Sequence, residues 1–221
     1  MKEKKKNKLL NFVVGTVVEL LVIVGIVSII SSGASKIKEI RLNSRAEKYA
    51  SYEEFISPVI MNDPDTFDDV SKANQSQLIA ISIWSILRDN VEPDKYEYAE
   101  GGMLMPEKEV EEEFRKLFGE ETKLSHRSVD GGVEFKYSEK KKCYIIPITG
   151  ITPIYTPDVL EADVKTNSVV LTVGYLAGED YKQDISGNMV PPEPSKYVKV
   201  TLRKGQSGEY YVAAIQNAEQ S

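Results

Sequence analysis

The residues of this chain with the greatest capacity for chemistry are one histidine and one cysteine. His126 and Cys143 are each the only residue of their type among 221. A nucleophilic thiol needs a base beside it, so these two side chains are one conceivable nucleophile–base pair. Cys143 stands between Lys142 and Tyr144 in a stretch that reads as a strand, and no motif surrounds it. The sequence therefore favours a buried structural cysteine over a catalytic one.

An acidic run at residues 63–69 invites comparison with a calcium-binding loop. An EF-hand loop that starts at Asp63 needs glycine where the chain has Asp68 and glutamate where it has Asn74. The run instead has the composition of a turn and a helix N-cap. A single histidine excludes a histidine-based metal cluster. The sequence thus indicates no catalytic residue, no metal ligand and no cofactor.

Aromatic side chains are the more promising binding groups. Of the twelve tyrosines, four fall in predicted loops: Tyr96, Tyr98, Tyr155 and Tyr181. Tyrosine joins a large apolar ring to a polar hydroxyl and is enriched at protein interfaces. Tyr155 also lies in a connector, residues 147–157, that is rich in proline and isoleucine. We predict a ligand or partner surface at these tyrosines, with closure of the core by a rigid connector as the alternative.

The elements that position these residues begin with a long apolar stretch. Residues 9–30 are almost entirely apolar, which at about 1.5 Å per helical residue is enough to span a bilayer core. The lysines in residues 1–8 predict that the N-terminus stays inside and the remainder lies outside the cytoplasm. A signal peptide cleaved after Ala34 is the alternative. The length of the apolar stretch favours an uncleaved anchor.

Glu19 lies at the centre of the predicted span. A charge there costs about 2.5–3.5 kcal/mol, so we consider Glu19 a possible contact with a partner membrane helix; a tolerated, protonated glutamate is the alternative. Residues 15–22 resemble the start of type IV pilins and pseudopilins, in which a peptidase cuts after a glycine and the fifth mature residue is glutamate. Here the glutamate is the fourth residue after Gly15, and apolar residues 9–14 stand in place of a polar leader.

The chain divides into four predicted regions. These are a basic cytoplasmic tail (1–8), a transmembrane helix (9–31), a juxtamembrane helix or linker (32–57) and an extracytoplasmic domain (58–221). The net charge is −6, but the basic clusters lie before residue 49, so residues 49–221 carry −12. An acidic domain argues against nucleic acid as a partner. One cysteine excludes an intrachain disulfide, and this composition suits a bacterial envelope protein.

The domain itself is predicted to be α+β, with helices first and strands after. A helix over 33–56 ends at Pro58, and two amphipathic helices over 71–90 and 106–118 pack on an antiparallel sheet of about six strands. The strands form three predicted hairpins: 133–137 with 142–148, 159–164 with 169–176, and 197–202 with 210–215. Residues 177–196 are predicted to form a long loop.

This layout resembles the nuclear transport factor 2-like and cystatin-like folds. A short tail, one span and such a domain together resemble the membrane-anchored assembly component of type IV secretion machines. The resemblance implies a binding or assembly module that is anchored in the lipid bilayer, with a homo-oligomer as one expected form. Its contact surface would be a sheet edge or a helix-lined concavity. The alternatives are a cell-envelope enzyme that uses carboxylates and a pilin-like subunit with an unbroken helix over residues 16–56.

Overall fold

The computed structural model describes most of the chain after residue 46. The described residues are 47–88, 95–99, 101–148, 154–183, 185, 187 and 189–218. The predicted tail, span and pilin-like start, with Glu19, lie outside them. No helix among the described residues is long and apolar enough to cross a membrane. Residues 49–221 form a compact unit of their own.

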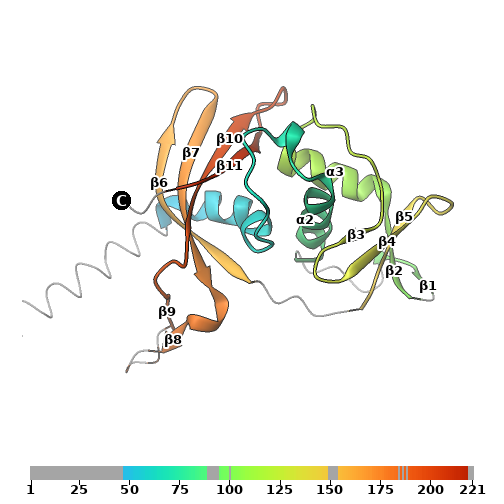
Figure 1. Ribbon diagram of the computed structural model, residues 1–221, viewed down its shortest axis with the longest axis horizontal. Coiled ribbons are helices and arrows are strands. Elements are labelled where there is room, and N and C mark those ends of the chain that lie inside the picture. Colours follow the sequence, from blue (N-terminus) through green and yellow to red (C-terminus); the bar gives the residue numbers. More distant parts are fainter. Residues whose placement is uncertain are drawn as a thin grey trace, which may run out of the picture. The chain divides into compact units, whose positions relative to one another are not determined.

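The unit is α+β, as predicted, but its strands form two main antiparallel sheets instead of one. The four-stranded sheet has the order β11–β10–β7–β6, and the five-stranded sheet has the order β1–β2–β5–β4–β3 (Figure 1). The bounds of the first are β6 (Tyr155–Val164), β7 (Ser168–Ala177), β10 (Tyr197–Lys204) and β11 (Tyr210–Asn217). Those of the second are β1 (Tyr98–Ala99), β2 (Gly102–Pro106), β3 (Val129–Asp130), β4 (Glu134–Ser138) and β5 (Cys143–Ile146).

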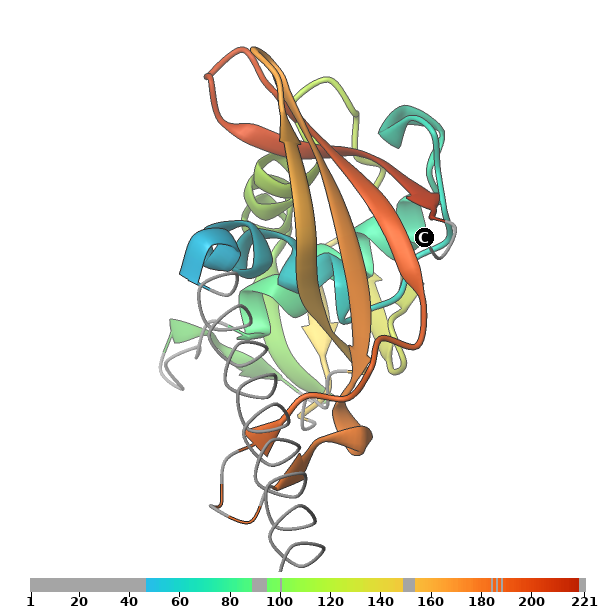
Figure 2. The same ribbon diagram turned by 90° about the vertical axis from the view of Figure 1, so that its left-hand side faces the viewer.

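All three predicted hairpins are confirmed as β4–β5, β6–β7 and β10–β11. The prediction of a single sheet is wrong. Strand β5 pairs on its other side with β2, which comes before the helix at residues 107–118, and the two strands belong to a second sheet. Neither β1 nor β2 shows a strong alternation of apolar and polar residues, so neither strand was predicted from the sequence. The long strands of the four-stranded sheet cross in front of the helices in Figure 2.

Helix α2 (Gln75–Arg88) lies between the two sheets (Figure 1). Leu78 and Ile81 pack in a first core with the four-stranded sheet, whereas Ile83 and Trp84 pack in a second core with the five-stranded sheet. Every residue from 78 to 85 is buried. A helix that is apolar on opposite sides must be covered on both, so α2 is a shared layer instead of the one-sided amphipathic helix that we predicted.

Helix α3 (Glu107–Phe118) agrees closely with its prediction. It presents Val110 to the second core and Phe114 and Leu117 to the first. Pro106 precedes it as the N-cap residue, and Gly119 follows it with φ 83°, a left-handed conformation that glycine adopts without strain. The sequence signals at both ends therefore identified the bounds of this helix.

A further helix occupies residues 47–60 and continues through Pro58, where we predicted that it would end. Proline has no N–H to donate to the carbonyl four residues earlier, which belongs to Glu54. The Arg88 side chain at the end of α2 donates to that carbonyl instead, at 3.4 Å. This contact replaces the missing bond, so the helix reaches Ile60 and buries that side chain in the first core.

The predicted loop 177–196 contains short elements. A 3₁₀ turn, η3 (Gly178–Asp180), leads to a small hairpin of β8 (Lys182–Gln183) and β9 (Met189–Val190). The chain then returns along β7, where the Tyr175 N–H donates to the Lys196 carbonyl at 2.9 Å. A second 3₁₀ turn, η1 (Val70–Lys72), precedes α2.

Because α2 packs against both sheets, we predict that each of its two buried faces contributes to the stability of the whole unit. Replacing Ile81 by alanine in the first core, or Ile83 by alanine in the second, should each lower the free energy of unfolding by about 2–5 kcal/mol. Both side chains are at most 1% exposed. Urea unfolding of the two variants should show one cooperative transition at a lower midpoint. Gln77→Ala at the helix start is the control, and loss of stability in only one isoleucine variant would contradict the shared core.

Candidate functional site

His126 lies in a polar cluster between the start of α3 and strands β4 and β5. Its Nε2 is 3.0 Å from a Glu111 carboxylate oxygen, and its Nδ1 is 3.1 Å from the Tyr144 hydroxyl. The Tyr137 ring stacks on the imidazole with ring centroids 5.1 Å apart. Because a carboxylate only accepts, Nε2–H donates to Glu111, and Nδ1 of the neutral ring accepts the Tyr144 hydroxyl proton. Both ring nitrogens are therefore engaged.

Glu107 adds a second carboxylate to the cluster. It accepts a hydrogen bond from the Tyr137 hydroxyl, lies 3.8 Å from the Lys142 ammonium and lies 3.9 Å from His126 Nε2. The hydrogen bond to Glu107 raises the pKa of Tyr137 to about 12. Donation from His126 lowers the pKa of Glu111 below its usual range. The Tyr137 hydroxyl is thus stabilised in the protonated form that donates to Glu107, and the Glu111 carboxyl in the ionised form that accepts from His126.

The cluster has the composition of an acid–base site but lacks a group that is free to act. A general base needs an open nitrogen within reach of a substrate proton, and here both nitrogens of His126 face protein partners. Cys143 therefore gains no base from His126. Among the described residues, no three histidine, cysteine or acidic side chains are grouped as a metal would require. The contacts of this cluster hold α3 against the five-stranded sheet. This structural role accounts for the position of the cluster and for its paired polar groups.

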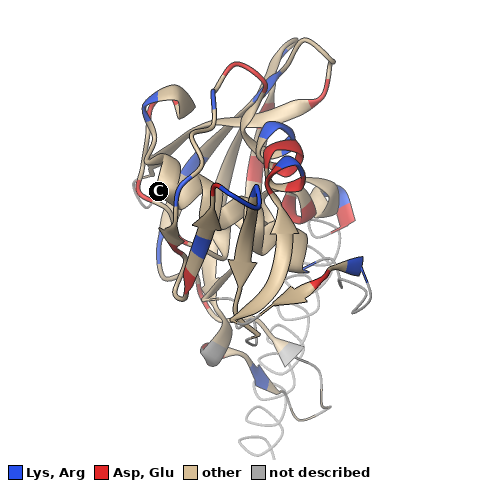
Figure 3. Ribbon diagram, turned by 90° about the vertical axis from the view of Figure 1, so that its right-hand side faces the viewer, with Lys and Arg blue, Asp and Glu red and all other residues tan. Residues whose placement is uncertain are grey.

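A cavity of about 550 Å³ lies beside this cluster on the outer face of the five-stranded sheet. Strand alternation places Leu104, Ile145 and Lys136 on that face, in one row across β2, β5 and β4. Their neighbours Met105 and Tyr144 point inward and are fully buried in the second core. Figure 3 views this sheet, where charged residues lie in α3 and in the β4–β5 turn and none lies in β2 or β5.

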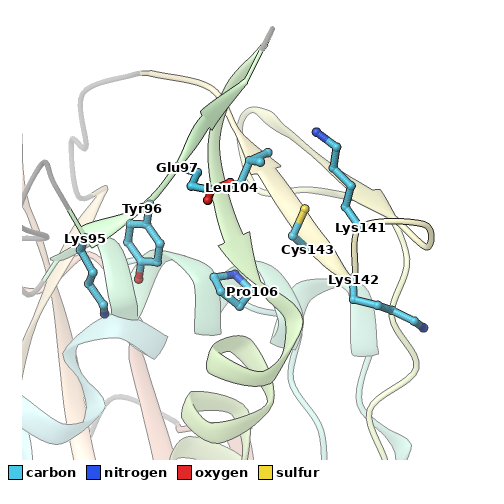
Figure 4. A pocket seen from close by; sticks show the side chains of 8 residues that line it. All are labelled: Lys95, Tyr96, Glu97, Leu104, Pro106, Lys141, Lys142 and Cys143. Carbon is cyan, nitrogen blue, oxygen red and sulfur yellow. The ribbon is translucent and has the colours of Figure 1, made fainter.

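The walls of the cavity come from both sides of β2. Figure 4 shows Glu97 on one side of β2, Lys141 and Cys143 on the other, and Leu104 and Pro106 on β2 itself. Lys95, Tyr96 and Lys142 complete the lining. The Lys142 carbonyl accepts the Glu107 N–H at 3.0 Å, and Lys142 holds a φ of 53°. The first turn of α3 therefore fixes the β4–β5 turn that forms one wall.

The Cys143 thiol lines this cavity although the residue is only 5% exposed. Burial raises its pKa, and the nearby Lys141 ammonium acts in the opposite direction. A thiol with a raised pKa is a poor nucleophile near neutral pH because little thiolate is present. The sequence-based interpretation of Cys143 as a structural residue agrees with this environment.

The structure separates the four tyrosines that we predicted to share a surface. Tyr96 is buried in the second core and donates to Glu109 at 2.5 Å, whereas Tyr98 is an exposed residue of β1. Tyr155 is the first residue of β6 rather than part of a loop. Tyr181 lies near it, with its hydroxyl 3.1 Å from the Thr156 hydroxyl. Of the four, only Tyr96 lines the cavity.

Tyr155 belongs to a packed aromatic group at the edge of the first core. Its ring meets that of Tyr175 edge-on, with centroids 5.2 Å apart. The Lys196 ammonium lies over both rings, 5.6 Å and 4.4 Å from their centroids, and pairs with Asp63. This arrangement corresponds to the alternative interpretation of Tyr155 as part of core closure.

Sequence reasoning missed the residues that form the cavity. Leu104 and Glu97 belong to a hairpin that was not predicted, and Lys141 was interpreted only as part of a turn. The β4–β5 hairpin was predicted, so the outward position of Lys136 and Ile145 could have been derived from its alternation. The pairing of β2 with β5, which completes the cavity, has no comparable local signal.

Comparisons with protein-family models, curated proteins and solved structures find no match to this chain. The site is therefore interpreted from its own geometry.

The lowered pKa of Glu111 predicts an acid-dependent loss of stability. A carboxyl group whose pKa is lower in the folded state stabilises the fold above its unfolded value and loses that contribution as pH falls. Wild type should therefore lose more stability than Glu111→Gln between pH 5 and 3, measured by urea unfolding at each pH. Glu112→Gln, at an exposed position of the same helix, should follow wild type. Parallel curves for wild type and Glu111→Gln would contradict the His126–Glu111 contact.

The environment of Cys143 predicts slow and strongly alkaline reactivity. Its rate with an aromatic disulfide reagent should stay well below that of free cysteine at pH 8 and should still rise above pH 9, because the pKa of the thiol is raised. Lys141→Gln should slow the reaction further, since Lys141 favours the thiolate. Lys140→Gln is the matched control. A rate already at its plateau by pH 8 would contradict this environment.

Proposed function

We propose that this chain is a single-pass membrane protein whose extracytoplasmic α+β unit binds another polypeptide. The apolar residues 9–30 and the lysines before them support the anchor and its orientation. Glu19 is a candidate contact with a partner helix in the bilayer. The charge of −12 on residues 49–221 argues against nucleic acid and anionic lipid as ligands of the unit.

The observation that carries the binding proposal is the outer face of the five-stranded sheet, on which no helix or strand of the described residues packs. Its inner face is covered by α2, whereas its outer face holds a cavity of about 550 Å³ with apolar and charged walls. A volume of this size is typical of ligand sites. An assembly role, suggested by the likeness of layout to type IV secretion components, would use the same face.

The other two predicted contact surfaces, the helix-lined concavity and the sheet edges, are less suitable for binding a polypeptide. The predicted helix-lined concavity is filled, because α2 packs between the sheets. The β6 edge has a bulge near Val159, and the Val159 N–H donates to the Glu53 carboxylate at 2.9 Å. On the β11 edge, Phe67 forms a β-bridge with Ile215. Bulges and covered edges are devices that oppose strand addition, so the sheet face is the better candidate.

The alternative of an envelope enzyme has less support from the described residues. Two carboxylates that lie near one another, those of Glu107 and Glu111, contact His126 and its neighbouring tyrosines rather than an open cavity. Glu111 has a lowered pKa, which keeps it ionised and unsuited to donate a proton. The arrangement therefore favours a binding module.

The proposed topology predicts opposite labelling of the two ends of the chain. In spheroplasts that express the full chain with Cys143→Ser, a cysteine introduced as Ser207→Cys in the exposed β10–β11 turn should react with a membrane-impermeant maleimide. A cysteine introduced as Lys5→Cys should react only after the membrane is opened. The reverse pattern would contradict the orientation, and labelling of neither before lysis would place the unit in the cytoplasm.

A second arm of the same experiment tests binding. A photoreactive residue at the exposed outward position Lys136 of β4 should give a discrete cross-linked species in native membranes. The same residue at Lys204 of β10, on the other sheet, serves as the comparison. Absence of any cross-link from either sheet would contradict a binding role for the unit.

A further inference from the structure

We propose that the cavity on the outer sheet face binds an extended segment of a partner polypeptide that places an apolar side chain between a cationic and an anionic one. This inference rests on the proposed binding function and specifies its ligand. The occupant follows from three properties of the cavity walls: an apolar floor, two uncompensated charges of opposite sign, and the distance between them.

The floor of the cavity is apolar and partly open to solvent. Leu104 of β2 is partly exposed, and Pro106 and the Cys143 thiol lie next to it across the β2–β5 pair. These side chains face outward from a sheet whose other side is already packed, so no further element of the described unit covers them. Burying a leucine-sized side chain there would favour binding by removing apolar surface from water.

The lysines that line the cavity differ in whether their charge is compensated. Lys95 forms an ion pair with Glu109, and the Lys142 ammonium lies 3.8 Å from a Glu107 carboxylate oxygen. Lys141 has no carboxylate partner among the described residues, although its charge acts on the Cys143 thiol.

Glu97 provides the opposite free charge. Its carbonyl accepts the Leu104 N–H at 2.8 Å, but its carboxylate has no cationic partner in the described part of the unit. Figure 4 shows Glu97 and Lys141 on opposite sides of the floor. A ligand that matches this cavity must therefore carry a cation for Glu97, an anion for Lys141 and an apolar group between them.

Strand geometry relates these positions to a peptide pattern. Glu97 lies opposite Leu104 and Ile145, whereas Lys141 lies in the β4–β5 turn, four residues before Ile145. Two strand spacings of about 4.8 Å and roughly four residues along the strand direction place the Cα atoms of Glu97 and Lys141 about 16 Å apart. In an extended peptide, residues i, i+2 and i+4 point to one side and span about 13 Å. The long side chains of lysine and glutamate extend this span, so the pattern Lys-x-Leu-x-Glu reaches both charged walls with its leucine between them.

The charge of the whole unit favours such a mixed segment over a purely acidic one. Residues 49–221 carry −12, so a ligand with only negative charge is repelled at long range even though Lys141 attracts it locally. A segment with one charge of each sign avoids this repulsion and still satisfies both walls. A lone anion would leave the Glu97 carboxylate unpaired.

The test uses the full chain in detergent and three capped, fluorescently labelled pentapeptides. Lys-Ser-Leu-Ser-Glu is the matched probe, Ser-Ser-Leu-Ser-Ser lacks the charges and Lys-Ser-Asp-Ser-Glu lacks the apolar group. Fluorescence anisotropy should rank the matched probe first, by about fivefold over the uncharged probe, the size that exposed charge pairs typically reach. The preference over the probe without leucine should be about tenfold, because that probe loses the burial of an apolar side chain. Bound matched peptide should also slow the reaction of Cys143, the only cysteine in the chain, with a thiol reagent.

Charge reversal assigns the peptide to the cavity. The substitution Lys141→Glu should weaken binding of the matched probe about fivefold. The resulting variant should instead prefer the peptide Lys-Ser-Leu-Ser-Lys. Glu97→Lys should likewise prefer Glu-Ser-Leu-Ser-Glu. Lys140→Glu, an exposed neighbour outside the cavity lining, is the control and should keep the wild-type ranking. Unchanged circular dichroism and thermal midpoints would show that the reversed variants fold.

Two results would overturn the proposal. One is equal affinity for all three probes, and the other is charge reversal that leaves the ranking unchanged in folded variants. Cross-linking from Lys204 but not from Lys136 would uphold the binding function while excluding this site. The absence of any cross-link would instead remove the function on which the proposal rests.

Discussion

The fold depends on burying helix α2 on two opposite sides. Its residues 78–85 are all buried, with one side in the core of the four-stranded sheet and the other in that of the five-stranded sheet. Polar side chains of this helix form hydrogen bonds to neighbouring elements: Trp84 donates to the Gly131 carbonyl at 2.7 Å, and Ser85 donates to the Glu113 carboxylate at 2.6 Å. Since buried polar groups must be paired, these contacts let one helix serve both sheets. The helix therefore commits the inner face of each sheet to the packed cores of the unit.

The polar cluster around His126 has a related consequence for the cavity. It holds the first turns of α3 against β4 and β5 through Glu107 and Glu111, and the Glu107 N–H binds the carbonyl of Lys142. The imidazole of His126 and the two carboxylates beside it are thereby used to fix a wall, while other side chains, such as Leu104 and Lys141, line the open space. Groups that bind a partner need exposure more than reactivity.

Local signals were enough to predict most of the elements. The three hairpins follow from alternation on either side of a turn, and the bounds of α3 follow from Pro106 and Gly119. The end of the helix at residues 47–60 was not predictable in this way, because the contact that permits Pro58 comes from Arg88, thirty residues later in the chain. The partition of strands into two sheets likewise depends on the β2–β5 pair, which joins segments separated by α3.

The sequence by itself determined the α+β class, the order of helices and long strands, the acidic charge of residues 49–221 and the absence of a disulfide. Its prediction of a membrane anchor rests on residues 9–30 and stays a prediction. Tertiary structure alone decided that Tyr96 is buried, that both nitrogens of His126 are occupied and that Glu97 and Lys141 face one cavity. The physical reason is that periodicity and turn chemistry act over a few residues, whereas burial and charge pairing depend on which distant segments pack together.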